Sequence, residues 1–111
     1  MNFSTIFKNF QSLSSGTDAF KQLKHQCEDV LHHSSLSQDA AILFLIYSFA
    51  KNYVLLYEDE AVSSEFAYSA KQQLLNYMQI LDSALQSKNA DLILTAHHQV
   101  IHDYVNSTRI F

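Results

Sequence analysis

The sequence predicts an all-α fold, and three features of the chain lead to that prediction. The 111 residues include one glycine, Gly16, and no proline. Because glycine supplies the positive φ angles of tight turns and proline breaks helices, a chain nearly free of both is typical of helices joined by short connections. Apolar residues recur at spacings of three and four, the period of a helix with one buried face. Short connections between such helices favour a compact bundle.

The first two helices are expected over residues 3–13 and 18–33. The first carries five apolar side chains on one face: Phe3, Ile6, Phe7, Phe10 and Leu13. We expect this face to dock on the core, with Gly16 as the C-terminal cap. Thr17 is the expected N-cap of the second helix. Cys27 falls within the apolar stripe of that helix, which predicts a small buried side chain rather than a reactive thiol.

The third helix is expected to begin near Ser37 and to end at Tyr57. Ser35 and Gln38 before it have the spacing of a capping box. Residues 40–47 are apolar without interruption and cover every side of two turns. A helix that is apolar all round must be surrounded by others, so we expect a central, buried third helix. The run is shorter than the ~20 residues of a membrane span.

The last two helices complete a bundle of about five. The fourth starts near Ser63 or Ser64 and reaches Ser87, and its alanines suit close helix packing. The fifth follows Asn89, which can cap it, and runs to about Ser107. Its inner face comprises Ile93, Ala96, Val100 and Tyr104.

Composition predicts a single helical domain over residues 1–111 that works in the cytoplasm. Hydrophobic residues make up 48% of the chain, and Cys27 is the sole cysteine, which fits a reducing compartment. The N-terminal residues lack the pattern of a secretory signal. Eleven acids and seven bases give a net charge of −4. This balance argues against direct nucleic-acid binding and favours a basic protein partner.

Six histidines raise the question of a metal site. Asp91, His98 and His102 fall within about 40° of one another on the fifth helix, and the two histidines have i, i+4 spacing. They lie away from its apolar stripe, however, and a metal site in a bundle needs inward ligands from facing helices. We therefore expect no metal or other cofactor, with these residues as the alternative ligand set. His97 lies on the apolar face and is expected to be a hydrogen-bonded core histidine.

Enzymatic activity finds little support in the sequence. A phosphate-binding loop, a dinucleotide fingerprint and a nucleophile elbow all require clustered glycines, which the chain lacks. Carboxylates that are adjacent in sequence, such as Glu28 and Asp29, point in different directions on a helix. We therefore expect a protein that works by binding and is not an enzyme.

The strongest functional signal is acidic. Four of the eleven acids lie within eight residues, and no lysine or arginine occurs between Lys51 and Lys71, so this window carries −4. Carboxylates attract a basic partner and neighbouring rings supply contact area. The predicted partner-binding residues are Tyr53, Tyr57, Glu58, Asp59, Glu60 and Glu65. The alternative is a solvated turn in which Glu65 favours the start of the fourth helix.

In size, helical content and the acidic segment Tyr57-Glu58-Asp59-Glu60, the chain resembles small all-helical bacterial immunity proteins of the contact-dependent growth inhibition and colicin D types. The resemblance implies stoichiometric inhibition of a basic toxin domain, for example a nuclease with a positively charged site. Glu58, Asp59 and Glu60 would mask that site, with Tyr53 and Tyr57 as anchors. No direct contact with nucleic acid or membrane is expected.

Two other functions stay open. The first is a helical adaptor or self-associating regulatory subunit, which would use a residual apolar face such as Phe3, Phe7 and Phe10. The second is a metal-dependent helical enzyme or sensor built on Asp91, His98 and His102.

Overall fold

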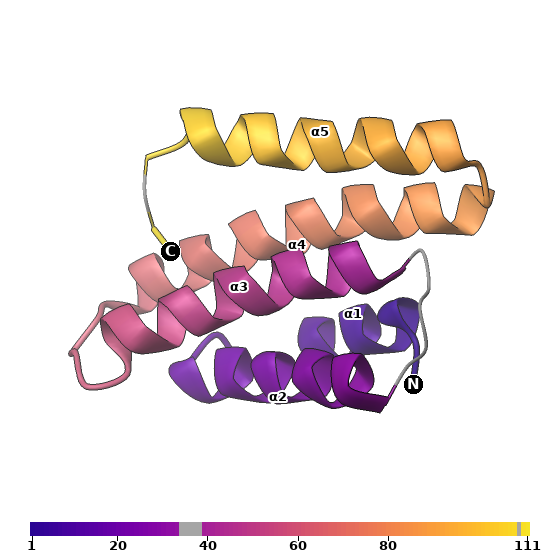
Figure 1. Ribbon diagram of the computed structural model, residues 1–111. Helices are drawn as coiled ribbons and strands as arrows, with labels where there is room; N and C mark the ends of the chain where they lie inside the picture. Colours follow the sequence, from indigo (N-terminus) through magenta and orange to yellow (C-terminus); the bar gives the residue numbers. More distant parts are fainter. Residues whose placement is uncertain (34–38, 109) are drawn as a thin grey trace.

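Each of the five apolar segments forms one α-helix in the computed structural model, which describes residues 1–33, 39–108 and 110–111 (Figure 1). The helices are α1 (Phe3–Ser12), α2 (Thr17–His33), α3 (Asp39–Tyr57), α4 (Ser64–Ser87) and α5 (Ala90–Asn106). The described residues contain no strand. The all-α, five-helix prediction is confirmed. Within the described residues, the ends of the predicted segments shift by at most one residue, and the predicted start of the third helix near Ser37 lies outside them.

Polar side chains begin three of the helices. The Asn2 side chain accepts a hydrogen bond from the Thr5 amide at 2.9 Å, and the Ser63 hydroxyl accepts one from the Phe66 amide at 3.1 Å. Asn89 caps α5, as predicted, by accepting from the amides of Asp91 and Leu92. Such caps satisfy amides that have no partner within the helix. The predicted capping box of Ser35 and Gln38 lies outside the described residues.

The prediction for Gly16 is wrong. Helix α1 ends at Ser12 and its C-cap, Leu13, has extended backbone, while Gly16 has no positive φ. The Gly16 carbonyl instead accepts a hydrogen bond from the Ala19 amide at 3.1 Å, so Gly16 belongs to the N-terminal end of α2. Among the described residues, Lys88 alone has positive φ, 55°, and it caps α4.

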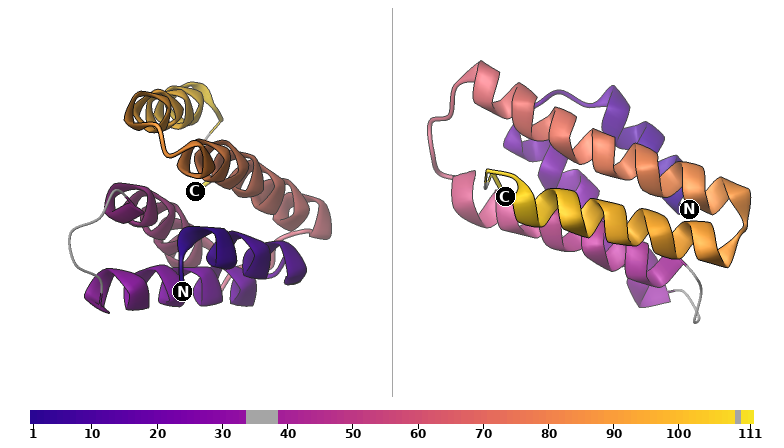
Figure 2. Two further views of the ribbon diagram at one scale, coloured as in Figure 1. Left: turned by 90° about the vertical axis from the view of Figure 1, so that its right-hand side faces the viewer. Right: turned by 90° about the horizontal axis from the view of Figure 1, so that it is seen from above.

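Figure 1 shows α3 and α5 running in the same direction, with α4 antiparallel to both. The most extensive packing is between α2 and α3, followed by α4 against α5. Helix α1 contacts both α2 and α4, and the end-on view in Figure 2 shows α5 on the far side of α4 from α1. Helix α5 is therefore the outermost element, held chiefly by one neighbour.

Helix α1 docks on the core, as predicted. Its apolar face is buried at Phe3, Ile6, Phe7 and Phe10. The Phe10 ring meets Phe20 of α2 edge-on, with ring centroids 5.4 Å apart. Because these phenylalanines are buried, the dimer face suggested for a self-associating subunit is not available on α1, and that part of the alternative is corrected.

Helix α3 contributes seven buried side chains to the core between α2 and α4: Ile42, Leu43, Ile46, Phe49, Ala50, Tyr53 and Val54. It is not enclosed on every side, because Phe44 is 60% exposed and Leu55 72% exposed. Its neighbours cover only part of its circumference. Of the described helices, α3 also has the length and mean hydropathy, 1.5, that a membrane span would need, a property that core helices share.

The last residue, Phe111, is fully buried. Its ring centroid lies 5.3 Å from that of Phe49 on α3 and 6.4 Å from that of Tyr77 on α4. The ring also stacks on Tyr104 of α5 at 6.1 Å, and the Tyr104 hydroxyl donates to the Phe111 carbonyl. The Phe111 side chain thus contacts α3, α4 and the outermost helix, α5.

Lys71 is a buried cation in the middle of α4, with an exposed fraction of 6%. Its ammonium donates to the carbonyls of Leu13 and Gln11, the latter at 3.4 Å, and lies 5.5 Å from the centroid of the Phe10 ring. Burial lowers the pKa of Lys71. The ammonium satisfies carbonyls left without partners at the C-terminal end of α1, where a positive charge is favourable.

The prediction that Cys27 is buried is confirmed. Burial raises the pKa of its thiol from 9.0 to about 12.

Between these two pKa values the unfolded chain loses the Cys27 thiol proton while the folded chain keeps it, so the free energy of unfolding falls as pH rises. We expect a loss of about 1.4 kcal/mol per pH unit from this group alone. Urea unfolding between pH 9 and pH 11 should therefore show a steeper loss in wild type than in Cys27→Ala, and equal slopes would contradict this assignment.

Candidate protein-binding site

The acidic segment forms the connection between α3 and α4. Two backbone hydrogen bonds keep it tight: the Glu58 amide donates to the Val54 carbonyl at 3.0 Å, and the Glu60 amide donates to Tyr57 at 3.1 Å. The side chains of Glu58, Asp59, Glu60 and Glu65 are all exposed. Four carboxylates therefore meet solvent at one end of the molecule, where the ends of α3 and α4 hold them close together.

The tyrosines behave differently from the prediction. Tyr53 is fully buried, so it cannot touch a partner, and its proposed role as an anchor is corrected. Its ring stacks on Phe20 at 3.8 Å and lies 4.9 Å from Tyr57. Tyr57 is half-buried and meets Phe66 of α4 edge-on at 5.0 Å. Tyr53 thus packs against Tyr57 from within the core, while part of Tyr57 is exposed at the surface.

The buried Tyr53 hydroxyl has no hydrogen-bond partner among the described residues. Burial is also the main cause of its raised pKa. We expect Tyr53→Phe to increase the free energy of unfolding by about 1–2 kcal/mol, because it removes an unpaired buried polar group at little cost in packing. Chemical denaturation measures this change. A decrease of similar size would mean that the hydroxyl is paired.

Sequence reasoning missed a cation at this site. Lys21 of α2 forms an ion pair with Glu58, and the hydrogen bond that its ammonium donates to Glu58 is the chief cause of the raised pKa of Lys21. The two residues are far apart in sequence, and no sequence pattern links them. The packing of α2 on α3 brings them together. Three carboxylates, those of Asp59, Glu60 and Glu65, are left for an outside partner.

A shallow groove of about 770 Å³ lies next to the start of α4. The connection at residues 15–17 forms one wall, and residues 62–65 with Tyr68 of α4 form the other. The Tyr68 ring is largely exposed, and Glu65 lines the same groove. An apolar ring next to a carboxylate suits a long basic side chain, whose stem packs on the ring while its charged end meets the acid. We call residues 58–60 and 65 together with this groove the acidic end.

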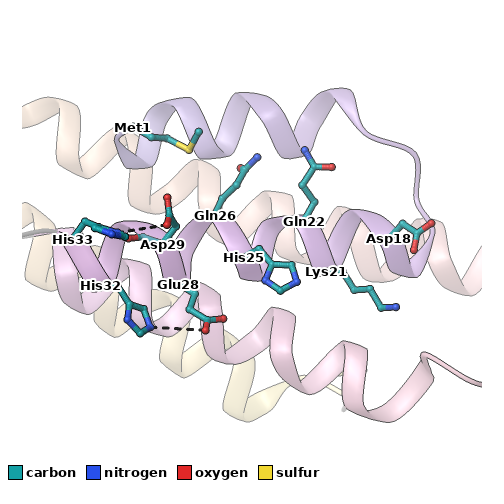
Figure 3. A pocket seen from close by; sticks show the side chains of 10 residues that line it. All are labelled: Met1, Asp18, Lys21, Gln22, His25, Gln26, Glu28, Asp29, His32 and His33. Atoms are coloured by element: carbon teal, nitrogen blue, oxygen red, sulfur yellow. Dashed lines mark hydrogen bonds and ion pairs between the residues drawn. The ribbon is translucent and has the colours of Figure 1, made fainter.

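The histidines form no comparable site. His32 lies 3.8 Å from Glu28 and His33 lies 3.5 Å from Asp29, on the outer surface of α2. Figure 3 shows the two pairs diverging to different sides of that helix, beside an open hollow of about 900 Å³.

The alternative metal ligands on α5, Asp91, His98 and His102, are exposed. The described residues contain no group of three ligand side chains that could hold a metal. His97 is half-buried and lines a small cavity rather than the core.

The fold and the site define an all-α globule of five helices with exposed carboxylates gathered at one end. No protein family, curated protein or solved structure matches this chain.

Proposed function

We propose that this chain is a binding protein whose acidic end masks the basic surface of a toxin domain, in the manner of an immunity protein. The observation that carries the proposal is the exposure of Asp59, Glu60 and Glu65 around the connection between α3 and α4, with Glu65 lining the groove. Of the described cations, Lys21 alone pairs with this group, and it occupies Glu58. A basic surface, such as the nucleic-acid site of a nuclease, has the charge that complements the remaining three.

Binding would begin with electrostatic attraction. Opposite charges speed the encounter of two proteins, and salt weakens the effect because the Debye length is about 8 Å at physiological ionic strength. After encounter, the exposed Tyr68 ring, the surface part of Tyr57 and the exposed Leu55 offer apolar contact area. Aromatic side chains of this kind often contribute much of the binding energy at interfaces.

The structure of the site reduces the conformational entropy that would be lost on binding. Glu58, Asp59 and Glu60 directly follow α3, whose C-terminal half is anchored by Tyr53 and Val54 in the core. Glu65 lies in the first turn of α4, which Ser63 caps. Because these backbones are already ordered, association need not immobilise a flexible loop.

The test is a titration with the product of the gene next to this one. If that product has a basic C-terminal domain with nuclease activity, we expect one equivalent of this chain to abolish the activity, and added salt to slow formation of the complex. A neighbouring product that forms no complex, or a complex whose association rate is independent of salt, would contradict the proposal. An unrelated enzyme as neighbour would favour the adaptor alternative.

A further inference from the structure

Helix α5 carries apolar surface that no described neighbour covers. Leu94 is 63% exposed, Ile101 47% and Val105 72%. At about 100° per residue, these three side chains continue the buried face of α5 around one side of the helix. We call Leu94, Ile101 and Val105 the α5 stripe. Helix α4, the chief neighbour of α5, therefore leaves these three side chains exposed.

The two ends of the stripe differ in shape. Near the start of α5 lies a cavity of about 230 Å³, lined by Ala41 of α3 and by Ala90, Ile93, Leu94 and His97. Near the end of α5, Val105 projects into solvent. One copy of the chain thus presents a hollow at one end of the stripe and an apolar projection at the other.

We propose that a second copy of this chain docks on the α5 stripe, with the two α5 helices antiparallel about a two-fold axis. If the axis passes between His97 and His98, position 90 of one copy lies level with position 105 of the other, and position 94 with position 101. Val105 of each copy then enters the hollow at Ala90 of the other. Such a contact is made twice, as two-fold symmetry requires.

The polar side chains at the edge of the stripe favour the same orientation, since an imidazole N–H can donate to a carboxylate. Asp91 lies near the start of α5 and His102 near its end, both on the outer side of the stripe. In the antiparallel arrangement Asp91 of one copy lies near His102 of the other, and the helix dipoles oppose each other favourably. A parallel arrangement would instead bring Asp91 against Asp91 and hollow against hollow.

The size of the surface sets the expected strength. Helix α5 has 17 residues and so spans about 26 Å. A stripe of that length and one helix in width is smaller than the roughly 800 Å² that each partner gives to a standard interface. We therefore expect a weak dimer that dissociates on dilution. The acidic connection lies beyond the end of α5 in Figure 1, so dimer formation leaves the acidic end open.

Sedimentation equilibrium of the full chain over a wide concentration range tests the proposal. We expect a monomer–dimer equilibrium that Val105→Asp weakens at least tenfold. The matched control is Leu92→Asp, because Leu92 is 51% exposed on the other side of α5 and its replacement should leave the equilibrium unchanged. Both positions are exposed, so both variants should fold, which circular dichroism verifies. A chain that stays monomeric at all concentrations, or equal weakening by the two variants, would overturn the proposal.

A charge exchange tests the orientation. We expect Asp91→Lys and His102→Asp each to weaken the dimer several-fold, because the first removes the carboxylate that faces His102 and the second places two carboxylates face to face. The double variant should recover wild-type association, because it restores an opposite pair. Additive weakening in the double variant would rule out the antiparallel arrangement.

Discussion

Phe111→Ala is expected to lower the free energy of unfolding by about 3–5 kcal/mol, the largest effect on stability that we predict. The ring is fully buried and touches Phe49, Tyr77 and Tyr104, each on a different helix. Removing it leaves a cavity where α3, α4 and α5 meet, and aromatic contacts are lost as well as buried area. Urea denaturation followed by circular dichroism measures the change.

The control for this prediction is Leu92→Ala, which shortens an exposed side chain of α5 and should change stability by less than about 0.5 kcal/mol. The amides of α5 should also exchange faster in Phe111→Ala, since α5 is held mainly by α4 and by this ring. A destabilisation below about 1 kcal/mol would show that the C-terminal residue does not join the three helices.

The double variant Asp59→Lys/Glu60→Lys is expected to reduce the association rate constant with a basic partner domain at least tenfold. Both side chains are exposed and neither forms an ion pair within the described residues, so the free energy of unfolding should barely change. Glu58 is left in place because its replacement would also break the pair with Lys21. Stopped-flow mixing with the neighbouring gene product at two salt concentrations measures the rate.

A matched control distinguishes the effect of the position of these charges on the association rate from the effect of the net charge. Asp29→Lys/Asp103→Lys reverses two exposed acids on α2 and α5. Each double variant replaces two negative side chains by two positive ones, so the formal net charge moves from −4 to 0 in both. We expect the control to slow association far less. Equal slowing would mean that net charge, rather than the acidic end, drives the encounter.

The helices could be predicted from the sequence because their causes are local. The spacing of Phe3, Ile6, Phe7 and Phe10 fixes the buried face of α1, and Asn89 next to the start of α5 is a cap by its own side chain. The exposure of the acids was predictable for the same reason. Gly16 misled because its position after a helix suggested a left-handed cap, although the backbone there needs no positive φ.

Features that depend on which helices pack together could not be predicted. Apolar residues lie on all sides of α3, so helical spacing did not say which of its sides faces the core, and Tyr53 lies on the buried side with Ile46 and Phe49. The Lys21–Glu58 pair arises only when α2 packs on α3. Similarly, the apolar run of α3 predicted an enclosed helix, but hydrophobicity alone does not say how many neighbours surround it, and Phe44 is left exposed.

The measurement that tests the central claim most directly is amide hydrogen exchange of the chain, alone and in the presence of the basic domain encoded by the neighbouring gene. A partner docked at the acidic end should slow exchange over residues 55–69, which include the connection and the first turn of α4. Exchange over residues 25–33, in the C-terminal half of α2, should stay the same. Slowing confined to α2 or α5, with residues 55–69 unchanged, would contradict the account.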